Sequence, residues 1–221
     1  VGTATVDGAG DWSLTTSALT EATHDLTVVA TDAAGNASSA SSALTVVVDT
    51  AAPSAPVVTG ITDDTGTSGS DGITSDTQLV FAGTAEANST VEVFIGAGSI
   101  GTTTAGAGGA WSFNHTGTTL ADGSYTVTAT ATDTAGNTSS ASGGFALTID
   151  TTAPATPSAP DLDAASDTGS SDSDDITSTQ AVDLSGTAEA NTVVEVFSDQ
   201  DGSVGTATVD GAGDWSLTTS A

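Results

Sequence analysis

The sequence of 221 residues contains no lysine, no arginine and no cysteine. It carries 28 Asp and Glu residues, which give a formal net charge of −28. A chain this negative repels other anionic surfaces, so we expect it to bind neither nucleic acid nor anionic membranes, and to favour cations. Because cysteine is absent, disulfide bonds and thiol chemistry are excluded.

Long apolar runs and catalytic residue pairs are also lacking. The apolar runs fall well short of the roughly 20 residues that a membrane-spanning helix needs, so we expect no membrane insertion. The two histidines, His24 and His115, lie in different copies of the repeat described next. No nucleophile–base pair is apparent in the sequence. We therefore expect the chain not to be an enzyme.

An internal repeat dominates what the sequence does contain. VGTATVDGAGDWSLTTSA occurs at 1–18 and again, unchanged, at 204–221. FAGTAEANSTVEVF at 81–94 returns as LSGTAEANTVVEVF at 184–197. The repeat is therefore about a hundred residues long, a common domain size. Three domains are predicted, and they are the C-terminal half of a repeat at 1–50, a complete repeat at 51–150, and the N-terminal two-thirds of the next at 151–221.

The complete repeat reads as β-structure throughout. Its apolar residues alternate with polar or small ones, which is typical of half-buried strands, and no segment has helical periodicity. Gly, Asn and Asp separate the segments as turn residues. About seven short strands in about a hundred residues predict an antiparallel immunoglobulin-like sandwich. The expected strands are 57–61, 79–84, 90–95, 98–104, 110–116, 124–132 and 139–149.

Two further features support a sandwich. The segment LADGSY ends in Tyr125 and resembles a tyrosine corner, in which the phenol bonds to an upstream main-chain group. In the preceding repeat His24 takes this place, and we interpret it as an imidazole that fills the same corner. Trp12, Trp111 and Trp215 begin equivalent strands, and we expect all three in the core.

Acidic residues are expected to meet where consecutive repeats join. In a sandwich with alternating strand directions, Asp49 should approach Glu86 and Asp133 at the first joint, and Asp150 should approach Glu189 at the second. Converging carboxylates without a cationic side chain require raised pKa values or a metal ion. Oxygen donors without cysteine indicate Ca²⁺. The alternative is that these acids are separate, solvated turn residues.

A second candidate for Ca²⁺ is the loop that reads DDTGTSGSDGIT in one repeat and SDTGSSDSDDIT in the next. Asp64 and Asp71 in the first copy recur as Asp167 and Asp174 in the second. Closely spaced Asp, Gly and Ser residues suit a loop that wraps a cation with side-chain and main-chain oxygens. The spacing is not that of an EF-hand. A flexible acidic loop without a metal is the alternative.

Four motifs in this order carry a family resemblance: VDTAAPSAP, SDTGSSDSDDITS, GTAEANTVVEVF and DGAGDWSLTTSALTEATHDLTVVATDAAGN. They resemble the bacterial Ig-like tandem repeats of giant surface adhesins, which are exported by type I secretion and often carry RTX repeats. The resemblance implies sandwich modules, joints made rigid by Ca²⁺, and a location outside the cell, on the bacterial surface.

We therefore expect a structural extender of a surface adhesin or an extracellular filament. Short Pro-containing linkers would make the tandem modules a semi-rigid rod. The expected partners are the neighbouring repeats of the same chain, and lateral or end-to-end association of rods is left open. The alternative is a binding module for ice, glycans or a host surface, suggested by Thr-rich strands such as TVTATAT. The ordinary preference of Thr for strands also explains these.

Overall fold

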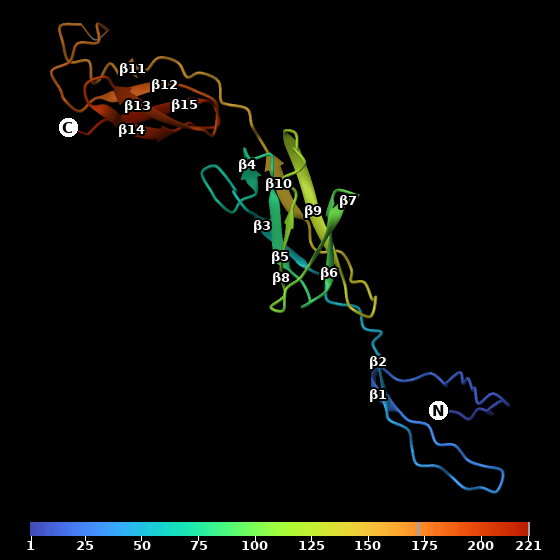
Figure 1. The fold of residues 1–221 in the computed structure, drawn as a ribbon. Helices are drawn as coiled ribbons and strands as arrows, with labels where there is room; N and C mark the ends of the chain where they lie inside the picture. The colour runs from blue at the N-terminus through green and yellow to red at the C-terminus, as the bar shows by residue number, and fades with distance from the viewer. Residues whose placement is uncertain (172, 221) are drawn as a thin grey trace. The chain divides into compact units, whose positions relative to one another are not determined.

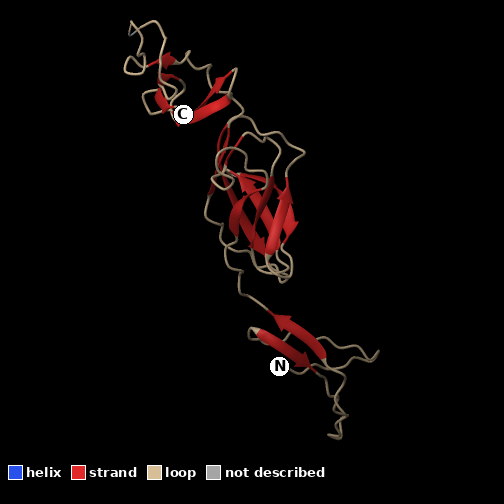
Figure 2. Cartoon of the chain, turned by 90° about the vertical axis from the view of Figure 1, so that its left-hand side faces the viewer, coloured by secondary structure: helices blue, strands red, loops and turns tan. Residues whose placement is uncertain are grey.

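The computed structural model describes residues 1–171 and 173–220. Within these residues the chain forms fifteen strands and no helix (Figures 1 and 2). An all-β fold was expected from the two-residue periodicity, and it is confirmed. The chain divides into two compact units, Val1–Thr151 and Thr152–Ala221.

Residues 52–151 contain two sheets (Figure 1). One sheet has the order β3-β5-β8, and its strands are β3 (Val57–Ile61), β5 (Val80–Thr84) and β8 (Ala110–Asn114). The other has the order β4-β10-β9-β6-β7, and its strands are β4 (Ile73–Thr74), β10 (Phe145–Ile149), β9 (Gly123–Thr132), β6 (Thr90–Ile95) and β7 (Gly98–Thr104). All pairs are antiparallel except β4 with β10.

The described residues 52–151 thus form eight strands, whereas the sequence predicted seven. The additional strand, β4, has only two residues, which is too short for alternation to reveal. It pairs in parallel with β10 and so attaches the acidic loop before it to the last strand of the repeat.

The core lies between the two sheets. Phe81 of β5 faces Val91 and Val93 of β6 and Val127 of β9, and each of these side chains is 0% exposed. Trp111 of β8 is also buried in this cluster, as expected. The inward residues are those that alternate with exposed or half-buried ones along each strand, so the periodicity of the sequence maps directly onto the two faces of the sheets.

The corner predicted at Tyr125 is confirmed. Its hydroxyl donates a hydrogen bond to the carbonyl of Ala121, at 2.8 Å. In the preceding repeat, Nε2 of His24 donates to the carbonyl of Thr20 at 2.7 Å, across the same step of four residues. His24 lies on β1 (Ala22–Leu26), which pairs with β2 (Leu44–Val48). The imidazole therefore replaces the phenol in the same structural role.

The second unit also contains two sheets. One has the order β11-β12-β15, with β11 (Asp161–Leu162), β12 (Asp183–Thr187) and β15 (Asp214–Thr218). The other pairs β13 (Val193–Ser198) with β14 (Gly202–Thr208). The small buried core of the second unit consists of Val194, Val209 and Trp215. No helix among the described residues is long and apolar enough to span a membrane.

The two copies of the identical segment differ in structure. The C-terminal copy contributes to β14 and β15 and buries Trp215, whereas residues 1–18 form no strand and leave Trp12 51% exposed. The expectation that Trp12 lies in a core is therefore wrong. Trp12 is exposed because its segment has no partner strands. In the C-terminal copy β15 pairs with β12 and β14 pairs with β13, whereas the described residues 1–50 contain no equivalents of β12 and β13.

Candidate metal centres

Asp133 organises the turn that follows β9. Its Oδ1 accepts hydrogen bonds from the main-chain N–H groups of Ala135, at 2.8 Å, and Asn137, at 2.9 Å. Its Oδ2 accepts from the Asn137 side chain at 2.9 Å. Gly136 takes the left-handed conformation that the turn requires, with φ of 94°. The turn built on Asp32 in the preceding repeat has the same bonds.

Asn137 links this turn to the preceding repeat. Its Nδ2 also donates to the main-chain carbonyl of Asp49, at 3.1 Å, across 88 positions of sequence. The carboxylate of Asp49 accepts from the N–H of Ala51 at 3.0 Å. Asp49 and Asp133 are therefore brought to one joint by Asn137, which was not among the residues predicted from the sequence. Its recurrence as the last residue of both copies of TDxAGN could have identified it.

Glu86, the third acid expected at this joint, lies in an exposed turn. Its main-chain carbonyl accepts from the N–H and the hydroxyl of Ser89, at 3.2 and 2.7 Å. Among the residues that the structure describes, no three Asp, Glu or His side chains form a group able to hold a metal ion. A cation at this joint would need carbonyl and hydroxyl oxygens as well as carboxylates.

The acids predicted at the second joint lie in different compact units, so each is described by itself. Asp150 follows β10, and its N–H donates to the carbonyl of Thr74 at 3.0 Å. The Oε2 atom of Glu189 accepts from the N–H of Ala155, in the Pro-containing linker, at 3.1 Å. Glu189 thus contacts the linker that precedes its own repeat. Its meeting with Asp150 stays a prediction.

The two acidic loops share one pattern of hydrogen bonds. Asp64 Oδ2 accepts from the N–H of Gly72 at 2.9 Å. At the equivalent place in the next repeat, Asp167 Oδ2 accepts from the N–H of Asp175 at 3.1 Å. The later acid of each loop accepts the N–H two residues further on, Asp71 from Ile73 at 3.0 Å and Asp174 from Ile176 at 3.3 Å. The four recurring acids therefore occupy equivalent places in equivalent loops.

The clearest electrostatic effect among these acids is at Asp133. The pKa of Asp133 is lowered from its ordinary value of 3.8, chiefly by the hydrogen bond from the Asn137 side chain. The fold thus favours the ionised carboxylate. Its stabilising contribution is present above the unfolded pKa and is lost as pH falls through the lower folded pKa.

We expect Asn137→Ala to raise the pKa of Asp133 toward its ordinary value, because the largest cause of the shift is removed. The measurement is an NMR titration of side-chain carboxyl carbons in the acid range. Asp32 serves as an internal control, because Asn36 lowers its pKa in the same way and is unchanged in this variant. An Asp133 that titrates as in the parent chain would contradict the assignment.

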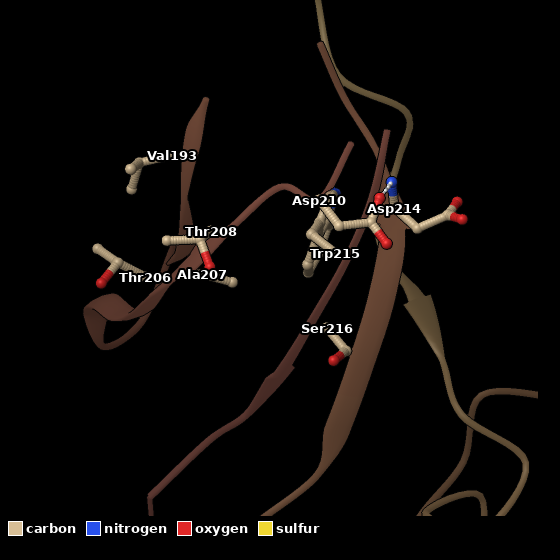
Figure 3. Close-up of a pocket in the computed structure, with 8 residues that line it drawn as sticks. All are labelled: Val193, Thr206, Ala207, Thr208, Asp210, Asp214, Trp215 and Ser216. Atoms are coloured by element: carbon tan, nitrogen blue, oxygen red, sulfur yellow. Dashed lines mark hydrogen bonds between the residues drawn. The ribbon is translucent and has the colours of Figure 1, made fainter. Parts of the chain in front are cut away.

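A hollow of about 740 Å³ opens between β14 and β15 in the second unit (Figure 3). Its wall contains Trp215, and at one end Asp210 accepts the N–H of Asp214 at 3.0 Å (Figure 3). In residues 52–151 the equivalent interior is filled by side chains of β9 and β10, such as Val127 and Leu147. The hollow is therefore core surface without those strands, and we assign it no ligand.

The chain is similar to known proteins in both sequence and structure. The family model of the bacterial Ig-like domain matches residues 1–50, 52–151 and 153–221. A solved tetra-tandem repeat from the extending region of a large adhesion protein is 26% identical, with a TM-score of 0.37, over 98% of this chain and 53% of that one.

A second solved structure comes from work on host cell surface retention of a 1.5-MDa bacterial ice-binding adhesin. It is 24% identical, with a TM-score of 0.36, over 90% of this chain and 64% of that one. The chain thus spans between half and two-thirds of the length of these two structures. No curated protein matches it.

Proposed function

The chain belongs to the bacterial Ig-like domain family, and on this premise we propose that it is a stalk segment of a large bacterial surface adhesin. In this role the repeats bind no substrate. They hold the adhesive part of the protein away from the cell, on the outside, and their working partners are the neighbouring repeats of the same chain. The stiffness of such a stalk depends on the joints between repeats, because the joints determine how far one repeat can move relative to the next.

One observation carries the proposal, namely the hydrogen bond from Asn137 Nδ2 to the carbonyl of Asp49. It ties the end of one repeat to a turn of the next, and the same Asn is held by Asp133. Without such contacts, relative motion is the default for domains joined by a short linker. A side chain that holds both the turn and the linker restricts that motion, as a stalk requires.

Ca²⁺ completes the proposed mechanism at these joints. With a net charge of −28 and no Lys or Arg, the chain has no cationic side chain to neutralise Asp49 and Asp133 at one joint, or Glu189 at the linker. Extracellular modules bind Ca²⁺ with a Kd of about 10⁻⁴–10⁻³ M. Joints of that affinity would be loose inside the cell, where Ca²⁺ is scarce, and would stiffen after export.

The alternative, a binding face for ice or glycans, has weaker support. On the outer face of the larger sheet, Thr104, Thr90 and Thr132 do align across three strands. The next positions along β6, however, are Glu92 and Phe94, which interrupt the array. Among these rows, only the one at Thr90 therefore carries a hydroxyl on all three strands, since Glu92 and Phe94 stand between hydroxyl residues in the next two. The ordinary preference of Thr for strands accounts for these residues.

Small-angle X-ray scattering of the whole chain tests the stalk. We expect a larger maximum dimension and lower flexibility in about 10 mM Ca²⁺, well above a Kd of about 10⁻⁴–10⁻³ M, than in EDTA. Asn137→Ala should weaken this response. Asn36→Ala is the matched control, because it removes the same amide from the same turn motif at a site with no bond to a preceding linker among the described residues. Identical scattering in Ca²⁺ and in EDTA would refute the stiffening.

A further inference from the structure

We infer that two copies of this chain associate end to end, through one repeat that both copies assemble. The hairpin of β1 and β2 in one copy adds to the free edge of β13 in the second unit of the other copy. The partner is therefore a second copy of this chain, and the interaction is the addition of strands to a sheet edge. The inference needs only these two surfaces and does not rest on the stalk proposed above.

The first surface is the free edge of β13. In the complete repeat the equivalent strand, β6, lies between β7 and β9. Among the described residues of the second unit, β13 pairs with β14 alone, so its other edge pairs with no strand. The core beside this edge is open, because Val196 and Leu184 are only half-buried. Their equivalents in the complete repeat, Val93 and Phe81, are 0% exposed. An unpaired edge beside exposed apolar side chains is a template for another strand.

The second surface is the apolar face of the β1–β2 hairpin. Residues 19–50 repeat the pattern of residues 120–151, which contain β9 and β10. No residue of 19–50 is buried. Val28 is 43% exposed, whereas its equivalent on β9, Ala129, is 0% exposed. A two-stranded sheet with an uncovered apolar face is only marginally stable in water, so this hairpin gains stability from a partner sheet.

The hairpin already has the conformation of the strands that it would replace. The residues of β1 and β2 pair in the same register as those of β9 and β10, position by position. The hydroxyl of Ser41 accepts the N–H of Val28 at 3.1 Å. In the complete repeat Ser142 accepts the N–H of Ala129 in the same way, at 2.9 Å. The hairpin therefore needs little ordering to dock, which lowers the entropic cost of association.

The complete repeat supplies the register of the pairing between copies. Val93 of β6 lies opposite Ala129 of β9 in an antiparallel pair. By the same register, Val196 of one copy lies opposite Val28 of the other. Two apolar side chains that are exposed or half-buried in the single chain would then cover each other, and their burial favours association.

The side chains of the two surfaces also fit in size. Leu184 stands where the complete repeat has the larger Phe81, and Val28 stands where it has the smaller Ala129. Because one change removes volume and the other adds it, the shared core keeps about the same content of apolar side chains. Protein cores tolerate changes of this kind when the total volume is kept.

The attachment points of the hairpin and of the second unit favour a second copy over the same chain. Asn137, in the turn after β9, donates to the carbonyl of Asp49, which follows β2. The linker to the second unit leaves from the end of β10, which pairs with the start of β9. The two attachments therefore lie at opposite ends of β9, a strand of ten residues and so about 33 Å long. A second copy is free of this separation.

The interface joins two different surfaces, so it is heterologous. Each copy that donates its hairpin keeps a free β13, and each copy that accepts a hairpin keeps a free hairpin of its own. Interfaces of this type build open linear assemblies unless the rotation closes a ring. We therefore expect a series of species that lengthens with concentration. Because each copy carries a net charge of −28, the association should be weaker at low ionic strength.

Sedimentation velocity of the whole chain over a range of concentrations tests the association, in EDTA to exclude bridging cations and in about 0.15 M NaCl to screen repulsion. Val28→Asp should weaken it by about 100-fold or more, because a charge would be buried against Val196. Val29→Asp is the matched control. Val29 is 50% exposed and lies on the opposite face of the hairpin, so the change should be no more than about twofold. A parent chain that stays monomeric, or equal losses in both variants, would overturn the inference.

Disulfide cross-linking tests the register, and the absence of cysteine from the chain leaves no competing thiol. Glu92 lies opposite Thr130 in the complete repeat, so Glu195 should lie opposite Val29 of the other copy. A mixture of Val29→Cys and Glu195→Cys should form a disulfide between copies, because opposite residues of a sheet have Cα atoms about 4.5–5.5 Å apart. Val47→Cys mixed with Glu195→Cys is the control. Val47 is 67% exposed on β2, whose equivalent, β10, does not pair with β6.

Two outcomes of cross-linking would contradict the inference. Equal cross-linking by Val29→Cys and Val47→Cys would mean that the copies meet without the expected register. A double variant with Val29→Cys and Glu195→Cys in one chain, oxidised at low concentration, should stay largely reduced. If it instead forms a monomer with an internal disulfide, the hairpin folds onto its own chain, and a second copy is not the partner.

Discussion

Removing Ca²⁺ with EDTA at low ionic strength is expected to lower the Tm of the chain by about 10 °C or more. A single ion at about 100 times its Kd stabilises the folded state by about 2.7 kcal/mol. For a domain of roughly 100 residues, each kcal/mol changes Tm by about 4–8 °C. More than one site is proposed, and the net charge of −28 opposes folding most strongly when it is neither neutralised nor screened.

Differential scanning calorimetry measures this effect, with salt as the control. In EDTA, raising NaCl to about 0.15 M shortens the Debye length to about 8 Å and should recover only part of the loss, because screening does not replace a bound ion. Mg²⁺ at the same concentration as Ca²⁺ should recover less than Ca²⁺ does. If NaCl alone restores the full Tm, the effect is general charge repulsion and the proposed sites are not needed to explain it.

Gly83→Ala is expected to destabilise the complete repeat by about 3 kcal/mol or more, a large share of a typical domain stability of about 5–15 kcal/mol. A Cβ atom at Gly83 would lie 2.1 Å from the carbonyl oxygen of Val57 and 2.4 Å from Cζ2 of Trp111. Both contacts are far inside van der Waals distance. Both contacts must be relieved, so β3 has to move away from β5 and the buried indole has to shift as well.

Denaturant unfolding followed by tryptophan fluorescence measures this change. Gly108→Ala is the matched control, because a Cβ at Gly108 meets nothing within 4 Å, and we expect it to alter stability by no more than about 0.5 kcal/mol. Gly186 repeats the arrangement in the next unit, with Trp215 Cζ2 at 2.7 Å. A Gly83→Ala variant as stable as the control would mean that this packing has more freedom than the structure indicates.

The sequence predicted the strands closely where alternation was long and regular. The expected strands 57–61, 90–95 and 98–104 have the observed bounds of β3, β6 and β7. The last expected strand, 139–149, is shorter in the structure, where β10 begins at Phe145. The hydroxyls of Ser139 and Ser142 accept the N–H groups of Ala131 and Ala129 there. Serine hydroxyls thus accept N–H groups of β9 that a neighbouring strand's carbonyls would otherwise accept. The alternation of apolar and polar residues does not reveal such side-chain hydrogen bonds.

The sequence predicted only part of the candidate sites. Recurrence in the sequence identified the acids of the loops and joints, because an identical spacing in two repeats is visible without a structure. It did not identify Asn137, whose bond to Asp49 depends on how two distant segments fold. Nor could it show that one oxygen of Asp64 and of Asp167 is buried and unpaired, because burial of a single atom depends on the packing around it.

The exact duplication of residues 1–18 at 204–221 has a consequence for how the chain folds. Because the two segments are identical, either one has the residues needed to pair with β12 and β13. Only residues 199–201 separate β13 from β14, and this short connection gives the C-terminal copy a high effective concentration at β13. Tandem arrays that contain exact copies therefore rely on short connections for correct pairing, and lengthening that turn would open the way to strand exchange between chains.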